Sequence, residues 1–209
     1  MLNLIIVQVL AGISLASLVG GFLLGHALDR SPRHPAHVVA KSDPGRWTEV
    51  VWVGGALVAA LWPIGVLLVP TYAYHWPPVP DFPGSSAVQV VGFLVSLAGG
   101  FLFFAAVRAL GRHMTPEIRV EQGHRLVQEG PYRYIRHPAY TAIVTGAGGL
   151  SVVYLSVPLA LLTLLLAGLA TYRAHLEEQL LRSGEAFGAT YTAYIARRGR
   201  FLPRLRSKS

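Results

Sequence analysis

Long apolar stretches recur along the chain and are separated by proline-rich or basic segments. Three of these stretches, 4–28, 50–69 and 85–107, contain no Asp, Glu, Lys or Arg. Each matches the roughly 20 residues that an α-helix needs to cross the hydrocarbon core of a bilayer. The pattern therefore predicts three transmembrane helices at these positions.

A fourth apolar stretch, 139–170, is too long for one span and just long enough for two spans and a turn. Proline breaks the hydrogen bonding of a helix interior, so the sequence Ser156-Val157-Pro158 marks the break. We expect a tight helical hairpin here. The predicted fold class is an all-α polytopic membrane protein with five transmembrane helices in a single membrane domain. The last two spans are expected over 139–155 and 158–172.

The composition agrees with a membrane protein and excludes several kinds of chemistry. Apolar residues make up 53% of the 209 residues, whereas charged residues make up 13%, about half of the roughly 25% found in soluble domains. The chain has no cysteine, which excludes disulfides, thiolate metal sites, iron–sulfur clusters and a cysteine nucleophile. All eight histidines fall at predicted span ends or in loops, whereas a transmembrane haem needs facing pairs inside the bundle. We therefore expect no metal site.

Lysine and arginine are concentrated in alternate loops. Residues 30–46 carry four of them, residues 70–84 carry none, residues 108–136 carry six arginines, and the chain after 173 is basic again. Because basic residues collect in cytoplasmic loops, we expect the N-terminus outside and the C-terminus in the cytoplasm. The net charge of +8 then reflects topology and attraction to anionic lipids, and we expect no nucleic-acid partner. Aromatic residues near predicted span ends are expected in the headgroup layer: Trp47, Trp52, Tyr72, Tyr74 and Trp76.

The segment 124–140 combines glycine, prolines, aromatics and cations directly before the predicted hairpin. Gly130-Pro131 indicates a turn, and Pro138 fits the first position of a helix, where its missing N–H costs nothing. Arg136 and His137 would then lie at a helix N-terminus, whose free N–H groups favour an anionic ligand. The alternative interpretation is a basic membrane anchor followed by a helix that begins with proline.

The segment 173–201 places acidic residues just beyond a predicted span. Glu177 and Glu178 each lie four residues from an arginine, so each could form only a surface ion pair. The alternative is that one carboxylate faces the turn before the hairpin, which would make a pocket for a zwitterionic ligand. Two aromatic residues would share a helical face and could close this pocket: Tyr191 and Tyr194.

At these residues the sequence resembles the isoprenylcysteine carboxyl methyltransferase family and, more loosely, phospholipid N-methyltransferases, over residues 105–203. The resemblance implies an integral membrane methyltransferase without a Rossmann-type fold. It also implies that S-adenosylmethionine is held on the cytoplasmic side, between the segments 108–138 and 173–203. The motif elements that carry it are His124-x-Leu126-Val127-x-x-Gly130-Pro131-Tyr132, Arg136-His137-Pro138-x-Tyr140, Glu177-Glu178-x-x-Leu181, Phe187-Gly188-x-x-Tyr191-x-x-Tyr194 and Arg200-x-x-Pro203.

The same resemblance implies roles for individual residues. The catalytic residues would be Arg136, Arg173 and Glu178. A lipophilic substrate would enter sideways from the bilayer, beside membrane lipids. A carboxylate acceptor would need an arginine to place it, whereas an amine or thiol would need deprotonation by Glu178 or His137, so the acceptor class stays open. The residues implied to bind the cofactor are His124, Leu126, Val127, Gly130, Pro131, Tyr132, His137, Tyr140 and Glu177.

Other functions remain open on the sequence. An Arg-His-Pro-x-Tyr turn also occurs in membrane sterol and steroid reductases that use NADPH, but there the residue after the proline is usually asparagine, and here it is Ala139. A non-catalytic lipid-binding protein with a degenerate pocket would bind no cofactor saturably. The cluster Gly146-Ala147-Gly148-Gly149 lies in an apolar stretch with no strand before it, and it favours close helix packing over nucleotide binding.

Overall fold

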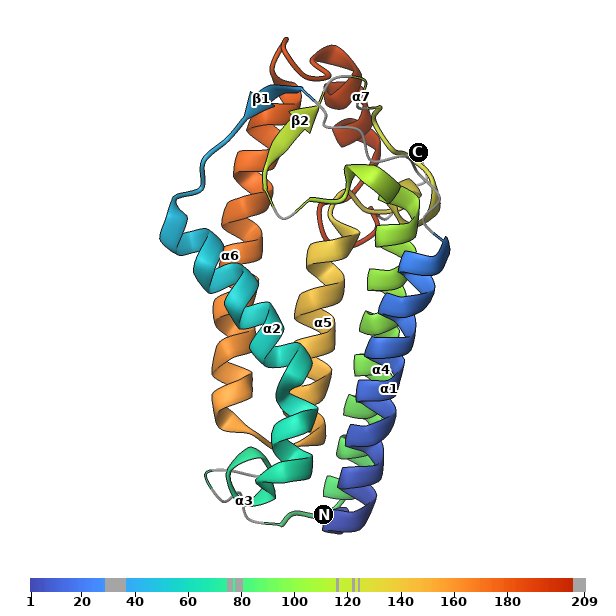
Figure 1. Cartoon of the computed structure of the whole chain (residues 1–209), viewed down its shortest axis with the longest axis vertical. Coiled ribbons are helices and arrows are strands. Elements are labelled where there is room, and N and C mark those ends of the chain that lie inside the picture. Colours follow the sequence, from blue (N-terminus) through green and yellow to red (C-terminus); the bar gives the residue numbers. More distant parts are fainter. Residues whose placement is uncertain are drawn as a thin grey trace.

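The computed structural model is mostly helical and elongated along one axis (Figure 1). Its described residues are 1–28, 37–74, 77, 81–115, 117–121, 123 and 125–204. The long helices alternate in direction along the axis (Figure 1): α1 (Leu4–Leu28), α2 (Arg46–Leu68), α4 (Ser85–Leu110), α5 (Pro138–Val153) and α6 (Val157–Arg182). The shorter elements are β1 (Val38–Lys41), α3 (Pro70–Ala73), η1 (Gly111–His113), β2 (Arg119–Glu121), η2 (Gly130–Arg133) and α7 (Ala189–Arg197).

The long helices have the composition of membrane spans. Within the described residues, α2, α4 and α6 are long and apolar enough to cross a bilayer, and Leu4–Ser17 and α5 are shorter apolar helices. Large apolar side chains are exposed along the bundle, which suits contact with lipid. Examples are Leu57, Leu61, Val91, Leu94, Phe101, Leu161 and Leu164. The prediction of a helical membrane protein is confirmed, while five complete spans remain a prediction.

Two helix starts in the second half of the chain agree with the sequence analysis. Pro138 is the first residue of α5. The helix ends at Val153, and α6 begins at Val157 after the cap residue Ser156, whose side chain accepts a hydrogen bond from the Leu159 N–H. The break predicted at Ser156-Val157-Pro158 is therefore confirmed. However, α6 continues without interruption to Arg182, ten residues beyond the predicted end of the span at 172.

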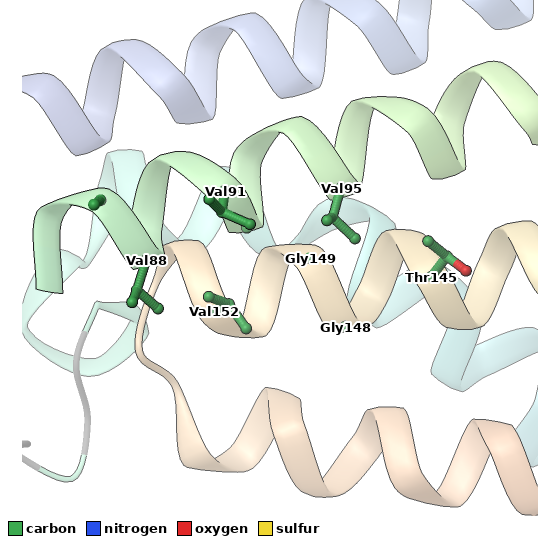
Figure 2. Close-up of a pocket in the computed structure, with 9 residues that line it drawn as sticks. Val88, Val91, Val95, Thr145, Gly148, Gly149 and Val152 are labelled. Atoms are coloured by element: carbon green, nitrogen blue, oxygen red, sulfur yellow. The ribbon is translucent and has the colours of Figure 1, made fainter. Parts of the chain in front are cut away.

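The interface between α4 and α5 is built on glycine. A Cβ atom on Gly99 would lie 2.6 Å from the backbone nitrogen of Gly146, and one on Gly92 would lie 2.8 Å from Val152. The glycine cluster of α5 therefore serves close helix packing, as the sequence favoured. The same two helices border an apolar groove of about 470 Å³ (Figure 2), and none of the predicted site residues that the structure describes lines it. Its lining includes Val88, Val91 and Val95 from α4 and Thr145, Gly148 and Val152 from α5.

Gln89 forms hydrogen bonds to several segments at the end of the bundle that holds the N-terminus. Its side chain is fully buried. Its amide nitrogen donates to the carbonyl of Val153 at 2.8 Å, and its oxygen accepts from the backbone N–H of Leu2 at 2.8 Å. The hydroxyl of Tyr74 completes the cluster by donating to the carbonyl of Leu2 at 2.8 Å. A buried amide is tolerated here because its hydrogen bonds are made.

A two-stranded antiparallel ribbon at the opposite end departs from the all-α prediction. Strand β1 pairs with β2 in the register Ala40 to Val120 and Lys41 to Arg119. Ion pairs extend the ribbon, from Arg119 to Glu121 at 2.7 Å and from Lys41 to Glu117 at 3.4 Å. The strands are only 4 and 3 residues long, too short for a period of two to be distinguished from a polar loop. The ribbon joins the N-terminal half of the chain to the segment before η2.

Candidate functional site

Two segments far apart in the sequence meet at the end of the bundle that carries α7. The stretch before α5 runs parallel to the stretch after α7, with a bridge between Ile135 and Gly199. The backbone N–H of Arg136 donates to the carbonyl of Gly199 at 2.9 Å, and that of His137 donates to the carbonyl of Arg200 at 3.1 Å. These backbone bonds hold the turn at 135–137 against the tail at 199–200, next to the charged end of α6.

Glu178 is the centre of the charges at this junction. Its carboxylate is 2% exposed and accepts two hydrogen bonds from Arg200, from Nε at 3.0 Å and from Nη2 at 2.6 Å. Nη1 of Arg136 lies 3.3 Å from Oε1 of Glu178. Nη2 of Arg182, one helical turn further along α6, lies 3.6 Å from Oε2. A buried carboxylate needs such partners, because an unpaired charge in this position would cost several kcal/mol. The surface-pair interpretation of Glu178 is therefore wrong.

His137 lies between the two carboxylates of α6. Its Nδ1 is 3.5 Å from Oε2 of Glu177, and its Nε2 is 3.2 Å from Oε1 of Glu178. Burial by itself would lower the pKa of His137, but the charge of Glu177 and the hydrogen bonds to Glu177 and Glu178 outweigh burial, so the pKa is raised above its ordinary value of 6.5. The imidazole thus favours the protonated form, with a carboxylate facing each ring nitrogen.

Tyr140 is fixed on α5 by contacts on several sides. Its ring stacks on His137 at 5.4 Å between centroids, and its hydroxyl donates to Oε2 of Glu177 at 2.9 Å. The ring also forms a T-shaped pair with that of Trp52 on α2, with 5.2 Å between the centroids and 84° between the planes. The side chain of Glu177 is 32% exposed.

The tyrosines of α7 pack on the turn before α5. Tyr194 donates a hydrogen bond to the carbonyl of Tyr132 at 2.6 Å, and its ring lies 5.8 Å from that of Tyr191. Both α7 tyrosines are buried, and burial raises the pKa of Tyr194 to about 12, which keeps the hydroxyl a neutral donor. The shared face expected from their spacing is present, and Tyr194 connects it to the turn at Tyr132.

The segment 125–132 rests on the end of α4. Val127 and Tyr132 are buried in a small apolar cluster with Ala106 of α4 and Ala139 of α5. Gly130 adopts a φ of +55°, and a Cβ there would lie 3.3 Å from that of Ala109, so glycine suits the turn. Leu126 and Pro131 are half-buried. His124, also predicted to bind the cofactor, lies outside the described residues.

Arg173 lies deeper in the bundle than the other charges. It is 1% exposed, one helical turn before Glu177, and its guanidinium carbon lies 5.8 Å from the ring centroid of Trp52. The sequence analysis placed Trp52 in the headgroup layer as a belt residue. The ring is 5% exposed and belongs to the core, so it does not face lipid, whereas Trp47 is 78% exposed. No rule of residue spacing predicts that Trp52 contacts α5 and α6.

Fold and site together define a helical membrane protein with a buried charge cluster at one end, built from α6 and the segments that flank its last two long helices. Residues 90–183 of the chain match the model of the isoprenylcysteine carboxyl methyltransferase (ICMT) family. The resemblance noted from the sequence is thereby confirmed over the part of the chain that contains α5 and α6.

Two curated proteins are similar to the chain over the same region. They are named "Probable protein-S-isoprenylcysteine O-methyltransferase" and come from Oryza sativa subsp. indica and Oryza sativa subsp. japonica. Each is 34% identical over 120 residues, which is 56% of this chain. The chain spans 61% of the length of these relatives, so the match concerns a shared region and not the whole of either protein.

Proposed function

We propose that the protein is an integral membrane methyltransferase that uses S-adenosylmethionine to methylate a lipophilic acceptor of the isoprenylcysteine type. One observation carries the proposal: the segments on either side of the α5–α6 pair join through Arg136 and Gly199, next to Glu177 and Glu178. The family match over 90–183 and the names of the rice proteins support the same reaction class.

The residues present suit the charged groups of the proposed cofactor. Glu177, partly exposed, offers a carboxylate to an ammonium group. The Nε of Arg136 is buried and donates to no group among the described residues, and a ligand carboxylate would satisfy it. Tyr132 and Val127 belong to a buried apolar cluster at this end of the bundle, and we propose that an adenine ring packs beside it. With Leu126, Gly130, Pro131, His137, Tyr140 and His124, these are the residues we propose for cofactor binding.

The chain's own residues would act mainly by placing the reactants. S-adenosylmethionine supplies a methyl group bonded to a positively charged sulfur. Transfer of this group is an in-line displacement, so catalysis depends on holding donor and acceptor about 3 Å apart in a site without water. We propose that Glu178 positions Arg136, Arg200 and His137, because both of its oxygens are already occupied by these partners.

The geometry favours a carboxylate acceptor over an amine or a thiol. An amine or thiol needs a base, but Glu178 is enclosed by cations and His137 has a raised pKa. A carboxylate is already anionic at neutral pH and needs only a cation to place it. Arg173, buried on α6 one helical turn before Glu177, is the residue we propose for that placement. The acceptor would reach it from the bilayer.

The topology belongs to the same proposal. All of the long helices would cross the membrane, with the N-terminus outside and the charge cluster at the cytoplasmic face. This arrangement places the polar donor in water and the acceptor's apolar part in lipid, which explains why such an enzyme would be embedded. The distribution of lysine and arginine supports it.

Two measurements on purified protein in detergent test the proposed function. The first is thermal stabilisation by S-adenosylhomocysteine and, separately, by NADPH. The second is transfer of a labelled methyl group to an S-prenylated cysteine derivative, with matched lipophilic amines and thiols as alternatives. Stabilisation by S-adenosylhomocysteine with transfer to the carboxylate is expected. Stabilisation by NADPH alone would favour a reductase, and stabilisation by neither would favour a non-catalytic lipid-binding protein.

A further inference from the structure

The two tyrosines of α7 use their hydroxyl groups differently. Tyr194 donates a hydrogen bond to the carbonyl of Tyr132 at 2.6 Å, which holds α7 on the turn before α5. Tyr191, three residues earlier, is 2% exposed, but its hydroxyl donates no hydrogen bond to any residue that the structure describes. A buried tyrosine hydroxyl usually has a partner, so the missing bond of Tyr191 requires an explanation.

The hydroxyl of Tyr191 can be reached from outside the protein. Among the described residues, the buried polar side-chain atoms that lack a hydrogen bond include Nε of Arg136 but not this hydroxyl. Because the hydroxyl lacks a bond too, it is not completely buried, although the rest of the ring is enclosed. A small molecule that enters the site can therefore accept a hydrogen bond from it.

The charge cluster surrounds this hydroxyl without binding it. Burial and the negative charges of Glu177 and Glu178 raise the pKa of Tyr191, and the positive charge of Arg136 opposes them. The hydroxyl is therefore within electrostatic reach of all three groups and stays protonated at neutral pH. Since it donates to neither carboxylate, its proton remains available for an anionic acceptor supplied by a ligand.

A second donor without a partner lies on the segment against which α7 packs. The hydroxyl of Tyr194 is 3.5 Å from the carbonyl oxygen of Ile135, the residue before Arg136. The face of α7 that carries Tyr191 therefore adjoins the turn that carries Arg136, whose Nε is buried and unbonded. Two such donors suit the two oxygens of one carboxylate.

We propose that the hydroxyl of Tyr191 donates a hydrogen bond to the carboxylate of the methyl donor and shares this group with Nε of Arg136. This inference rests on the proposed function and adds a residue to the proposed donor site. Glu177 would hold the ammonium group of the same ligand, so the two ends of its amino-acid part would be bound by separate residues. The hydroxyl of Tyr194 would serve only to hold α7 in place.

The test uses two ligands that differ by one group. S-adenosylhomocysteine carries a carboxylate and an ammonium group, whereas its decarboxylated analogue keeps only the ammonium. Calorimetry on the full chain in detergent gives the Kd of each ligand for the wild type, Tyr191→Phe and Tyr134→Phe. Tyr134 is a matched control because it is 60% exposed. Thermal unfolding without ligand compares the stability of the variants.

Tyr191→Phe should weaken binding of the ligand that carries the carboxylate. Its Kd for S-adenosylhomocysteine should rise about tenfold or more, because a hydrogen bond to a charged group is lost. The Kd for the decarboxylated analogue should stay within about twofold. The melting temperature should not fall, because the ring keeps its contact with Tyr194 at 5.8 Å. Tyr134→Phe should leave both Kd values within about twofold of the wild type.

Glu177→Gln should give a different pattern with the same two ligands. Both ligands carry the ammonium group, so loss of the carboxylate charge should raise both Kd values by a similar factor. Discrimination between the ligands should therefore fall in Tyr191→Phe and persist in Glu177→Gln. The comparison separates the residue proposed for the carboxylate from the residue proposed for the ammonium.

Other outcomes overturn the inference. If the wild type binds S-adenosylhomocysteine and Tyr191→Phe leaves that Kd unchanged, Tyr191 has only a packing role. An equal rise in Kd for both ligands would mean that its hydroxyl does not contact the carboxylate. A clear fall in melting temperature would mean that the hydroxyl is needed for the fold, which also contradicts the proposal. If the wild type binds neither ligand, the proposed function fails and this inference fails with it.

Discussion

Arg200 donates a hydrogen bond to each carboxylate oxygen of Glu178, from Nε to Oε1 at 3.0 Å and from Nη2 to Oε2 at 2.6 Å. A guanidinium fork on a carboxylate is among the strongest polar contacts that proteins make. Here it joins the chain after α7 to the end of α6, across 22 residues. This buried carboxylate adds α6 to the junction that the backbone bonds of Arg136 and His137 make with the tail, and several measurable consequences follow from it and from its neighbours.

Glu178→Gln should destabilise the protein strongly. The substitution leaves Arg136, Arg200 and His137 without their shared negative charge, and breaking a buried pair in this way typically costs about 3 to 5 kcal/mol. Thermal unfolding in detergent measures the loss. Glu185→Gln, an exposed change near the end of α6, should have almost no effect. Equal stability of the two variants would contradict the central role of Glu178.

Glu177→Gln should weaken binding of S-adenosylhomocysteine while the protein stays folded. The amide keeps an acceptor for the Tyr140 hydroxyl but loses the charge proposed to hold an ammonium group. A charged hydrogen bond contributes about 1.5 to 3 kcal/mol, so calorimetry should show at least a tenfold rise in Kd. Glu129→Gln, whose side chain is 75% exposed, is the control. An unchanged Kd would assign Glu177 to structure alone.

Stability should fall at alkaline pH because of His137. Its pKa is raised in the folded protein, so its ion pairs contribute fully below the ordinary value of 6.5 and are lost as the pH rises through the folded pKa. Thermal unfolding between about pH 5.5 and 9.5 should therefore show a decline that His137→Asn removes. At each pH the melting temperature of the variant is subtracted from that of the wild type, and this difference should fall as the pH rises. A difference that grows with rising pH has the wrong sign and would refute the assignment.

Gly149→Ala should disrupt the contact between α4 and α5. An added Cβ would meet the carbonyl oxygen of Gly92 at 2.7 Å, and backbone atoms cannot move aside as a flexible side chain can. Overpacking of this kind costs about 1 to 3 kcal/mol. Gly100→Ala on α4, where nothing lies within 4 Å, should be neutral or slightly stabilising. Equal melting temperatures for the two variants would show that the interface adjusts.

Cysteines introduced one at a time can report the topology, because the chain has no cysteine of its own that a thiol reagent would also label. Pro83→Cys lies at the α3 end of the bundle and Thr190→Cys lies at the charge cluster, and both positions are exposed. A membrane-impermeant thiol reagent should label Pro83→Cys in intact cells and Thr190→Cys only after lysis. The reverse pattern would place the charge cluster outside, away from the cytoplasmic donor.

The sequence was most informative where a residue type has one physical consequence. Proline at 138 and at 158 marked helix starts, uncharged runs marked apolar helices, and the glycines of α5 marked close packing. Adjacent polar motifs indicated which segments belong to one site. The contacts themselves could not be predicted, because i,i+4 spacing explains Glu178 equally well as a surface pair.

Trp52 and the β1–β2 ribbon show what the pattern could not reveal. An aromatic residue near the start of an apolar helix satisfies the rule for a membrane belt whether it faces lipid or the core. The ribbon consists of segments too short for periodicity, and its pairing depends on where the helices place them. In both cases the deciding information is tertiary, so local sequence rules give the wrong environment or none.

The uninterrupted course of α6 has a mechanical consequence. Arg173, Glu177 and Glu178 are carried by one continuous helix that runs from Val157 to Arg182, so their mutual spacing is set by the helix geometry. A change in bilayer thickness that tilts or slides this helix displaces all three charges together, relative to the ring of Trp52 and the tail at Arg200. We therefore expect lipid chain length to affect the alignment of the cluster.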